Sequence, residues 1–342
     1  MSARDRLKRD LLRFVREGST DEFDALALRV ATFQAESLPA YRALVKGMGR
    51  TIQHWQDAPL VPTEVFRSVD LSLPGAEARA VFLTSGTTGM GHRGMRRVPD
   101  LDLYHAGCRT PFIQGVLDGD DRSRPWLSLI PSAESLPNSS LSHMVSFLGE
   151  ELASPLVFCA DAHGLKLDVT QNALTRWTEA QEPYLILTTS FALMHLLTGL
   201  HAFPKAPVGS RLMLTGGFKG KTRAVTETEL LTRIEDQLGI GASQVRGEYG
   251  MTELSSQAYG SPFQSPPWLR MRVVDPVTRI DVAPKNEGLV AFFDLLNLDN
   301  VSAILTSDCG MLDSDGRLTL LGRAPGSRTR GCSLQAEDWE VV

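Results

Sequence analysis

A segment rich in hydroxyl groups and glycine follows an apolar stretch that ends at Leu83. It reads Thr-Ser-Gly-Thr-Thr-Gly. Glycine lets backbone N–H groups approach an anion closely, and the serine and threonine hydroxyls add hydrogen-bond donors. The pattern predicts a β-strand that leads into a phosphate-binding loop, although an ordinary polar turn has the same composition. The candidate phosphate-binding residues are Thr84, Ser85, Gly86, Thr87, Thr88 and Gly89.

Two later segments place a carboxylate beside glycine and hydroxyl groups. One reads Tyr-Gly-Met-Thr-Glu from Tyr249 to Glu253, and the other reads Ser-Asp-Cys-Gly from Ser307 to Gly310. Each motif alone is a weak signal. Together and in this order, the three segments resemble the hallmarks of the adenylate-forming superfamily, which includes acyl- and aryl-CoA synthetases, luciferases and nonribosomal adenylation domains.

The resemblance implies roles in forming an acyl-adenylate from ATP. A carboxylate must attack the α-phosphate, so negative charge has to be offset by metal, cations and backbone donors. By resemblance, Glu253 binds Mg²⁺, Thr252 donates to the α-phosphate, and Asp308 accepts hydrogen bonds from the ribose. Tyr249 would stack on adenine, and Arg323 would contact ribose or phosphate. The ATP-binding candidates of these segments are Tyr249, Gly250, Asp308 and Arg323.

These residues also have ordinary structural explanations. Glu253 could lie in the first turn of a helix, where a carboxylate suits the helix dipole. Tyr249 could be a packing residue at the end of a strand. Asp308 could be a common turn residue before glycine.

Basic residues stand near two glycine-rich segments. Superfamily phosphate loops usually end in a lysine, but here Met-Gly-His-Arg follows Gly89, so His92 and Arg93 are the candidate cations. A solvated basic loop is the alternative. A second glycine-rich stretch matches the superfamily's adenine-side loop, and its lysines are the nearest substitutes for a lysine that the C-terminal lid usually contributes. Its candidate residues are Gly216, Gly217, Lys219 and Lys221.

A predicted helix that begins near Ser140 carries the candidate acyl pocket. Small residues lie on one side of it, and Met144, Phe147 and Leu148 lie on another. Related enzymes place their acyl pocket here, which makes His143 and Met144 the candidate contacts. More often, such an apolar stripe is simply core.

The last residues of the sequence include a cysteine between charges of opposite sign. Cys332 follows Arg328 and Arg330 and precedes a cluster of acidic residues. Nearby arginines favour the thiolate, which is the attacking form of cysteine. Six extended residues after Gly326 could span about 20 Å, which would let the thiol reach a site and move away from it again. An incidental cysteine in a frayed terminus is the alternative.

This ending resembles the LuxE-type acyl-protein synthetases of bacterial fatty-acid reductase complexes, with a match from about Pro62 to Trp339. Gly322 and Arg323 correspond to a hinge before a mobile lid, and only 19 residues follow them, so the lid is expected to be absent. The resemblance implies that ATP activates a long-chain fatty acid. Cys332 would then accept the acyl group as a thioester and deliver it to a partner acyl reductase.

Three other functional classes are alternatives to this one. A stand-alone acyl- or aryl-CoA ligase, similar to phenylacetate-CoA ligases, would release a CoA thioester, but the missing lid argues against it. A non-catalytic nucleotide- or acyl-binding scaffold would explain the missing loop lysine. A P-loop NTPase is disfavoured because His92 and Arg93 stand where Lys and Ser or Thr are needed, and Thr215 replaces the first glycine of a second candidate loop. The stretch from Val290 to Asp294 imitates the metal-binding strand of that class.

Composition narrows the class of protein further. The chain has 342 residues, of which 42% are hydrophobic and 22% charged, as in an ordinary globular protein. Its formal charge of −5 gives no electrostatic reason to expect a nucleic-acid partner. No apolar run approaches the length of a membrane span, and the N-terminus lacks the features of a signal peptide. Four cysteines without CxxC spacing favour a reducing cytoplasm.

Periodicity predicts the elements that must hold these segments. Helical spacing predicts an N-terminal helical layer over Arg4–Arg16 and Asp21–Phe33 and a helix start near Pro62. From Ala78 onward, short apolar strands alternate with helical patterns, which predicts βαβ units and a largely parallel sheet. The predicted strands are Ala80–Leu83, Trp126–Ile130, Leu156–Cys159, Tyr184–Thr188 and Arg211–Leu214. The predicted helices begin near Asp100, Ser140, Val169, Ser190 and Thr222.

Beyond Gln257 the pattern changes. Strand candidates follow one another without long helices, which predicts an antiparallel or barrel-like portion. They are Leu269–Val274, Leu289–Asp294, Ala303–Thr306 and Leu318–Leu321. The fold class is therefore α/β, with the large-domain fold of the adenylate-forming enzymes. The expected parts are a helical layer (residues 1–60), the adenylate-forming domain (61–323) and a flexible tail with the acceptor cysteine (324–342).

Overall fold

The computed structural model describes residues 1–17, 21–49, 51–84, 93–120, 123–200, 202–216 and 226–324. Several predicted site residues lie outside these ranges, so their roles stay predictions. They are Ser85, Gly86, Thr87, Thr88, Gly89, His92, Gly217, Lys219, Lys221 and Cys332.

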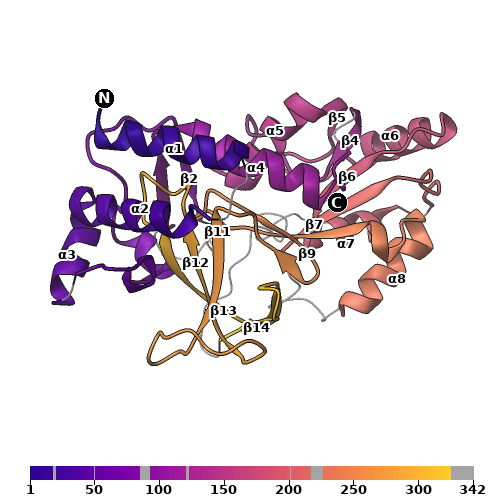
Figure 1. Ribbon diagram of the computed structural model, residues 1–342. Helices are drawn as coiled ribbons and strands as arrows, with labels where there is room; N and C mark the ends of the chain where they lie inside the picture. Colours follow the sequence, from indigo (N-terminus) through magenta and orange to yellow (C-terminus); the bar gives the residue numbers. More distant parts are fainter. Residues whose placement is uncertain are drawn as a thin grey trace.

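Three helices open the chain. They are α1 (Ala3–Glu17), α2 (Phe23–Ser37) and α3 (Pro39–Gly47), and a short 3-10 helix, η1 (Trp55–Asp57), follows them. The two predicted helices are confirmed, whereas α3 was not predicted. The helices α1 and α2 lie beside the antiparallel part of the sheet (Figure 1), and their apolar side chains pack in one core cluster with Phe293 of that part. Arg4 of α1 adds an ion pair of 2.6 Å to Asp299.

A parallel sheet forms the next part of the molecule. Its strands are β4 (Arg124–Ser128), β5 (Ala153–Phe158), β6 (Leu185–Thr189), β7 (Arg211–Thr215) and β8 (Val245–Tyr249), in the order β5-β4-β6-β7-β8. The parallel pairing confirms the predicted βαβ units.

In the part of the chain that the structure describes, one helix directly precedes these strands and four helices connect them. They are α4 (Leu101–Gly115), α5 (Ser140–Leu152), α6 (Leu167–Glu179), α7 (Ser190–Gly199) and α8 (Glu227–Leu238). Four of them begin after a residue whose side chain accepts a backbone N–H of the first turn, which is the usual N-cap chemistry. These N-caps are Asp100, Ser139, Thr189 and Thr226. The last predicted helix start, Thr222, lies outside the described residues.

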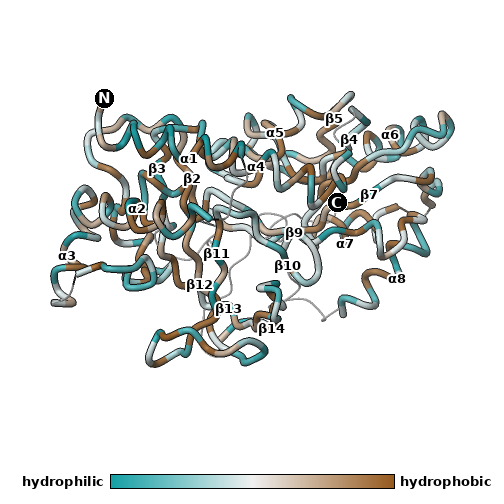
Figure 2. The backbone as a smooth tube through the Cα atoms, viewed as in Figure 1, coloured by the Kyte–Doolittle hydropathy of each residue, from teal (hydrophilic) through white to brown (hydrophobic). Residues whose placement is uncertain are grey.

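The parallel sheet is covered on both faces, and strand alternation explains how. Ile186 and Leu212 pack with α6, α7 and α8, whereas their neighbours Leu185, Leu187 and Met213 pack with α4 and α5. Successive side chains of a strand point to opposite faces, so a run of apolar residues serves both layers. The helices themselves alternate hydrophilic and hydrophobic colouring along their length, as expected for one buried side (Figure 2).

The sheet continues through antiparallel strands, as predicted. They are β9 (Ala258–Gly260), β10 (Phe263–Gln264), β11 (Leu269–Val274), β12 (Gly288–Asp294), β13 (Ala303–Leu312) and β14 (Leu318–Arg323), and β1 (Val61–Pro62) adds a parallel pair to β13. β13 is longer than predicted because it pairs with β12 along one part and with β14 along another.

One strand prediction was wrong in its partner. β2 (Ala80–Leu83) does not join the parallel sheet but pairs antiparallel with β3 (Met95–Val98) in a separate hairpin. The pattern of an apolar strand does not specify which neighbour it bonds. The remaining 3-10 helices are η2 (Thr63–Arg67) and η3 (Ala242–Gln244). Among the described helices, none combines the length and apolar character needed to cross a bilayer.

Candidate functional site

Thr84 closes the base of the β2–β3 hairpin. Its backbone N–H donates to the carbonyl of Gly94 at 2.8 Å, and its Oγ1 accepts the N–H of Gly94 at 2.8 Å. Residues 85–92 lie between the two strands in sequence and outside the described ranges. Thr84 is therefore bound to Gly94 through two hydrogen bonds, and Arg93, which precedes Gly94, is exposed.

The hairpin lies against the Tyr249–Glu253 segment, far away in sequence. The Thr252 hydroxyl makes a weak hydrogen bond of 3.5 Å to the carbonyl of Leu83, the residue before Thr84. Arg96 of β3 donates to the carbonyls of Thr252 at 3.3 Å and Leu254 at 2.7 Å. The tertiary structure thus brings strands β2 and β3 against the segment predicted to bind magnesium.

Thr252 and Glu253 lie in a buried turn. They are 7% and 4% exposed, and the turn is closed by a hydrogen bond from the N–H of Leu254 to the carbonyl of Met251. No helix follows, since the next element after β8 is the strand β9. The alternative that Glu253 serves the first turn of a helix is therefore wrong.

Asp294 holds the residues that follow this turn. Its carboxylate accepts the N–H groups of Ser255 and Ser256 at 2.8 and 3.0 Å, together with the Ser256 hydroxyl and the N–H of Leu296. Burial raises the pKa of Asp294, and these donors act in the opposite direction. The strand β12, whose sequence imitates the metal-binding strand of P-loop NTPases, thus ends in a carboxylate that accepts hydrogen bonds from backbone N–H groups.

Asn297 adds a second support that sequence reasoning missed. Its Nδ2 donates to the carbonyls of Glu253 at 2.8 Å and Val301 at 3.0 Å, and its Oδ1 accepts from Ser255 Oγ at 2.8 Å. Arg96, Asp294 and Asn297 come from segments with no recognised motif. Of the three, only Asp294 had a signal in the sequence, because it is a polar residue at the end of an apolar strand.

Three of the predicted ATP-binding residues form a connected group. The Tyr249 hydroxyl donates to Asp308 Oδ2 at 2.7 Å, and Arg323 Nε donates to Asp308 Oδ1 at 3.0 Å. The Tyr249 ring packs against Phe263 and Phe292 with centroids 5.5 and 5.6 Å away, and burial raises its pKa. Packing of its ring therefore accounts for part of the role of Tyr249.

Asp308 does not lie in a turn, so the alternative that it is a common turn residue before glycine is wrong. It lies within β13, opposite Arg323 of β14, and a register shift follows between Cys309 and Gly310. The glycine therefore marks an irregularity within a strand pair, which has the same sequence signal as a turn. The strand pairing fixes the position of the Asp308 carboxylate, and this side chain is 18% exposed.

Glu248 connects the adenine-side loop to the tyrosine segment, and sequence reasoning missed it. The Thr215 hydroxyl at the end of β7 donates to Glu248 Oε2, and the Ser190 hydroxyl donates to the carbonyl of Gly216. A Cβ on Gly250 would lie against Glu248 Oε1, so a larger residue here would displace the Glu248 carboxyl group. Burial raises the pKa of Glu248 to about 7.

We expect Glu248→Gln to remove a pH dependence of stability. The pKa of Glu248 rises from 4.5 to about 7 on folding, so between these values the native state keeps a proton that the unfolded chain releases. Stability therefore falls as pH rises through this interval, by about 3 kcal/mol in total, and is level above it. Urea unfolding at several pH values measures the effect.

The matched control for this experiment is Glu235→Gln on the exposed side of α8. Its free energy of unfolding should follow that of the wild type at every pH. Parallel curves for Glu248→Gln and the wild type would contradict the prediction.

The two predicted acyl-pocket residues differ in their surroundings. His143 of α5 is half-buried, and its Nε2 lies 3.1 Å from Nε2 of His105 on α4. Its ring packs 5.4 Å from that of Phe82 in β2, and burial lowers its pKa. Met144 is 1% exposed within the core, where its sulfur accepts the Tyr259 hydroxyl at 3.8 Å. His143 thus lies beside the hairpin, whereas Met144 is packed.

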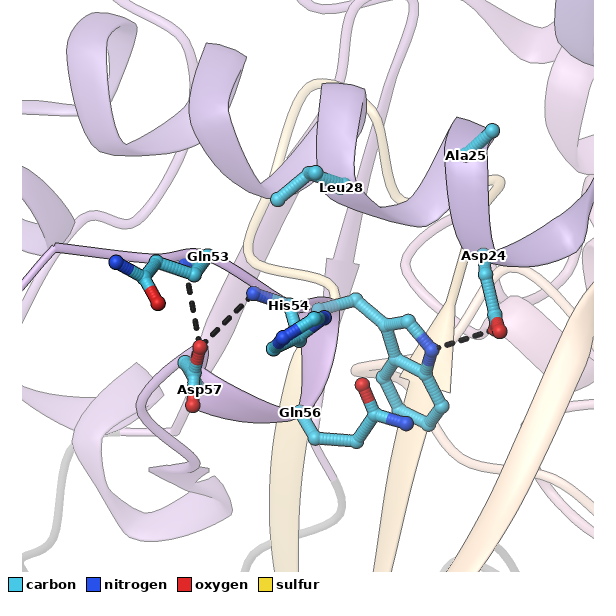
Figure 3. A pocket seen from close by; sticks show the side chains of 8 residues that line it. Asp24, Ala25, Leu28, Gln53, His54, Gln56 and Asp57 are labelled. Carbon is cyan, nitrogen blue, oxygen red and sulfur yellow. Dashed lines mark hydrogen bonds between the residues drawn. The ribbon is translucent and has the colours of Figure 1, made fainter.

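A hollow of about 520 Å³ opens elsewhere, between α2 and η1 (Figure 3). Asp24, Ala25 and Leu28 line it together with residues 53–57. Trp55 Nε1 donates to Asp24 Oδ1 at 2.7 Å across its wall. None of the predicted site residues lines this hollow, so it is not the acyl pocket that the sequence predicts.

Comparisons with known proteins place this geometry in context. No protein-family model matches the chain. It is 20% identical over 303 residues to the long-chain-fatty-acid–luciferin-component ligase of Vibrio harveyi, covering 84% of this chain and 79% of that one.

The solved structures agree on the fold. A 2-hydroxyisobutyryl-CoA ligase in complex with 2-HIB-AMP and CoA has a TM-score of 0.62 at 16% identity, covering 90% of this chain and 76% of that chain. An ATP-bound RpMatB-BxBclM chimera has a TM-score of 0.51 at 15% identity and covers 71% of this chain. This chain spans about half the length of that chimera, 47%. The chain therefore has the large-domain fold of the adenylate-forming enzymes, and its predicted resemblance to the LuxE-type acyl-protein synthetases is confirmed.

Proposed function

We propose that this protein is an ATP-dependent ligase that activates a long-chain fatty acid as its acyl-adenylate. The observation that carries the proposal is the contact between the β2–β3 hairpin and the Thr252–Glu253 turn. This contact supports the proposal because it joins the residues at the base of the predicted phosphate loop to the turn that carries Glu253. The sequence relative, a ligase whose name specifies a long-chain fatty acid, supports this substrate class.

The first step joins the fatty acid to AMP. A carboxylate oxygen attacks the α-phosphorus, the new C–O–P linkage forms, and the bond to the β-phosphate breaks to release pyrophosphate. The hairpin loop, with His92 and Arg93, would hold the phosphates. Thr252 would donate to the α-phosphate, and Lys219 or Lys221 would supply further positive charge.

The carboxylate of Glu253 would hold a magnesium ion at this site. Among the described residues, no group of three or more His, Cys, Asp or Glu side chains is gathered as a metal site. Mg²⁺ commonly uses one or two carboxylates, with phosphate oxygens and water completing its shell. Glu253 would be that carboxylate, and the ion would offset charge on the phosphoryl oxygens.

The Tyr249–Asp308–Arg323 group would bind the ribose. An ionised carboxylate has about four acceptor sites, and two donors already fix the orientation of Asp308. The remaining capacity suits two neighbouring hydroxyl groups.

The second step would transfer the acyl group to Cys332 and then to a partner acyl reductase. The thiolate attacks the acyl carbon, the C–S bond forms, and AMP leaves with the oxygen. A nearby pair of arginines in sequence favours the thiolate form. The product is a thioester ready for reduction.

The deciding experiment compares the wild type with Cys332→Ser, given ATP, Mg²⁺ and labelled fatty acids of several lengths. The variant should exchange pyrophosphate into ATP at the wild-type rate but carry no label that hydroxylamine releases. Cys309→Ser is the control and should be labelled like the wild type.

Other outcomes favour other functions. Full labelling of Cys332→Ser would move the acceptor elsewhere. CoA-dependent turnover without a protein-bound label would indicate an acyl- or aryl-CoA ligase. Binding of ATP without any exchange would indicate a non-catalytic scaffold.

A further inference from the structure

Arg96 is a buried cation at the contact between the two candidate segments. It is 2% exposed and lies on β3, the strand that returns from the predicted phosphate loop. Its neighbour Arg97 points the other way, is 45% exposed and pairs with Asp70 at 3.2 Å. Alternation along a short strand thus places one arginine inside and the other outside.

The guanidinium of Arg96 binds the turn that carries Thr252 and Glu253. One terminal nitrogen donates to the carbonyls of Thr252 and Leu254, and the other donates to Ser255 Oγ and, at 2.9 Å, to Asn297 Oδ1. The planar fork of arginine suits several acceptors at once, which lysine cannot match. Every acceptor belongs to the turn or to its support.

The charge of Arg96 also reaches the candidate metal ligand. No ion pair links it to a carboxylate among the residues that the structure describes. Asp294 and Glu253 instead act on it through space, and burial lowers the pKa of the guanidinium. An arginine keeps its charge even so, and a buried positive charge favours the approach of phosphate.

Contacts with several elements hold the hairpin in place: Phe82 and Val98 pack with α4 and α5, and Asn300 donates to the carbonyl of Arg97. An isolated pair of strands is marginally stable at best. Leu83 donates its N–H to the carbonyl of Asn138, and Asn138 Nδ2 donates to the carbonyl of Val81. These bonds join the hairpin to the start of α5, whereas Arg96 joins it to the turn.

We propose that Arg96 is a positioning residue that fixes the Thr252–Glu253 turn against the β2–β3 hairpin. The groups expected to bind phosphate and magnesium then approach one nucleotide together. This inference rests on the proposed function, because it assumes that ATP and Mg²⁺ bind there.

The test measures ATP binding to the full-length protein by calorimetry, with Mg²⁺ and with a chelator in its place. The quantity compared is the dissociation constant measured with the chelator divided by that measured with Mg²⁺. This ratio reports how much Mg²⁺ strengthens ATP binding. Arg96→Lys keeps the charge but loses the fork, and it should lower this ratio about tenfold, the size expected for hydrogen bonds to a charged group. Arg97→Lys is the control on the same strand and should leave the ratio unchanged.

A purely structural role for Arg96 has a different signature. If the role were purely structural, Arg96→Lys would reduce the fraction of folded protein and raise both dissociation constants by the same factor. An unchanged ratio therefore overturns the proposal. A wild type that binds no ATP with Mg²⁺ overturns the proposed function as well. If Arg96→Lys fails to unfold cooperatively, Ser255→Ala removes one acceptor and should lower the ratio about threefold. An unchanged ratio in Ser255→Ala would then overturn the proposal.

Discussion

Glu253→Gln should lower ATP–pyrophosphate exchange on the order of a hundredfold or more, while leaving the protein folded. The change removes a negative charge but keeps the size of a side chain that is 4% exposed. A metal that stabilises charge in the transition state contributes several kcal/mol, and each tenfold in rate corresponds to about 1.4 kcal/mol. The exchange rate at saturating ATP and fatty acid, measured against Mg²⁺ concentration, tests this.

Two observations would separate this effect from damage to the fold. The carbonyl of Glu253, which accepts from Asn297 at 2.8 Å, remains in the variant, so its unfolding curve should stay close to that of the wild type. Glu287→Gln, in an exposed loop, should exchange at the wild-type rate. An exchange rate of Glu253→Gln within a few-fold of the wild type would remove Glu253 from the metal site.

Asp294→Ala should be the most destabilising of the substitutions considered. Asp294 is fully buried and accepts three backbone N–H groups and one hydroxyl, so its removal leaves four donors without this acceptor and takes away one of the negative charges near Arg96. Breaking a buried charged network by removing one member costs about 3–5 kcal/mol. Urea unfolding, monitored by tryptophan fluorescence, measures the loss.

The control for this prediction is Asp315→Ala, in an exposed turn between β13 and β14. It should change the free energy of unfolding by less than about 0.5 kcal/mol, as is usual for surface substitutions. A loss below about 1 kcal/mol in Asp294→Ala would show that water or repacking satisfies the four donors.

The sequence predicted local structure well because local structure depends on neighbours in the chain. Asp100 and Ser139 precede helices whose first-turn N–H groups they accept, and such capping is visible in the residue order. The strand Leu269–Val274 was predicted with its observed bounds, since a short apolar run between turn residues is a local signal. The three motifs also predicted a resemblance and a fold, and the comparisons agree with both.

Site geometry was predicted less completely. Tyr249, Asp308 and Arg323 were each named from the motifs, and the structure connects them through one carboxylate. Thr252 was expected at the phosphates, but no local pattern revealed that Arg96 would bind its carbonyl. Ten of the predicted residues lie outside the described ranges and remain predictions.

What the amino-acid order determined by itself was the identity of the reactive segments and the elements that flank them. Only the tertiary structure decided that β2 turns back on β3, that Asp308 lies within a strand, and that a buried arginine joins two segments. The physical reason is that strand partners and buried polar networks depend on contacts between residues far apart in sequence. Their energies come from shape and charge in a shared interior, and neither leaves a periodic trace along the chain.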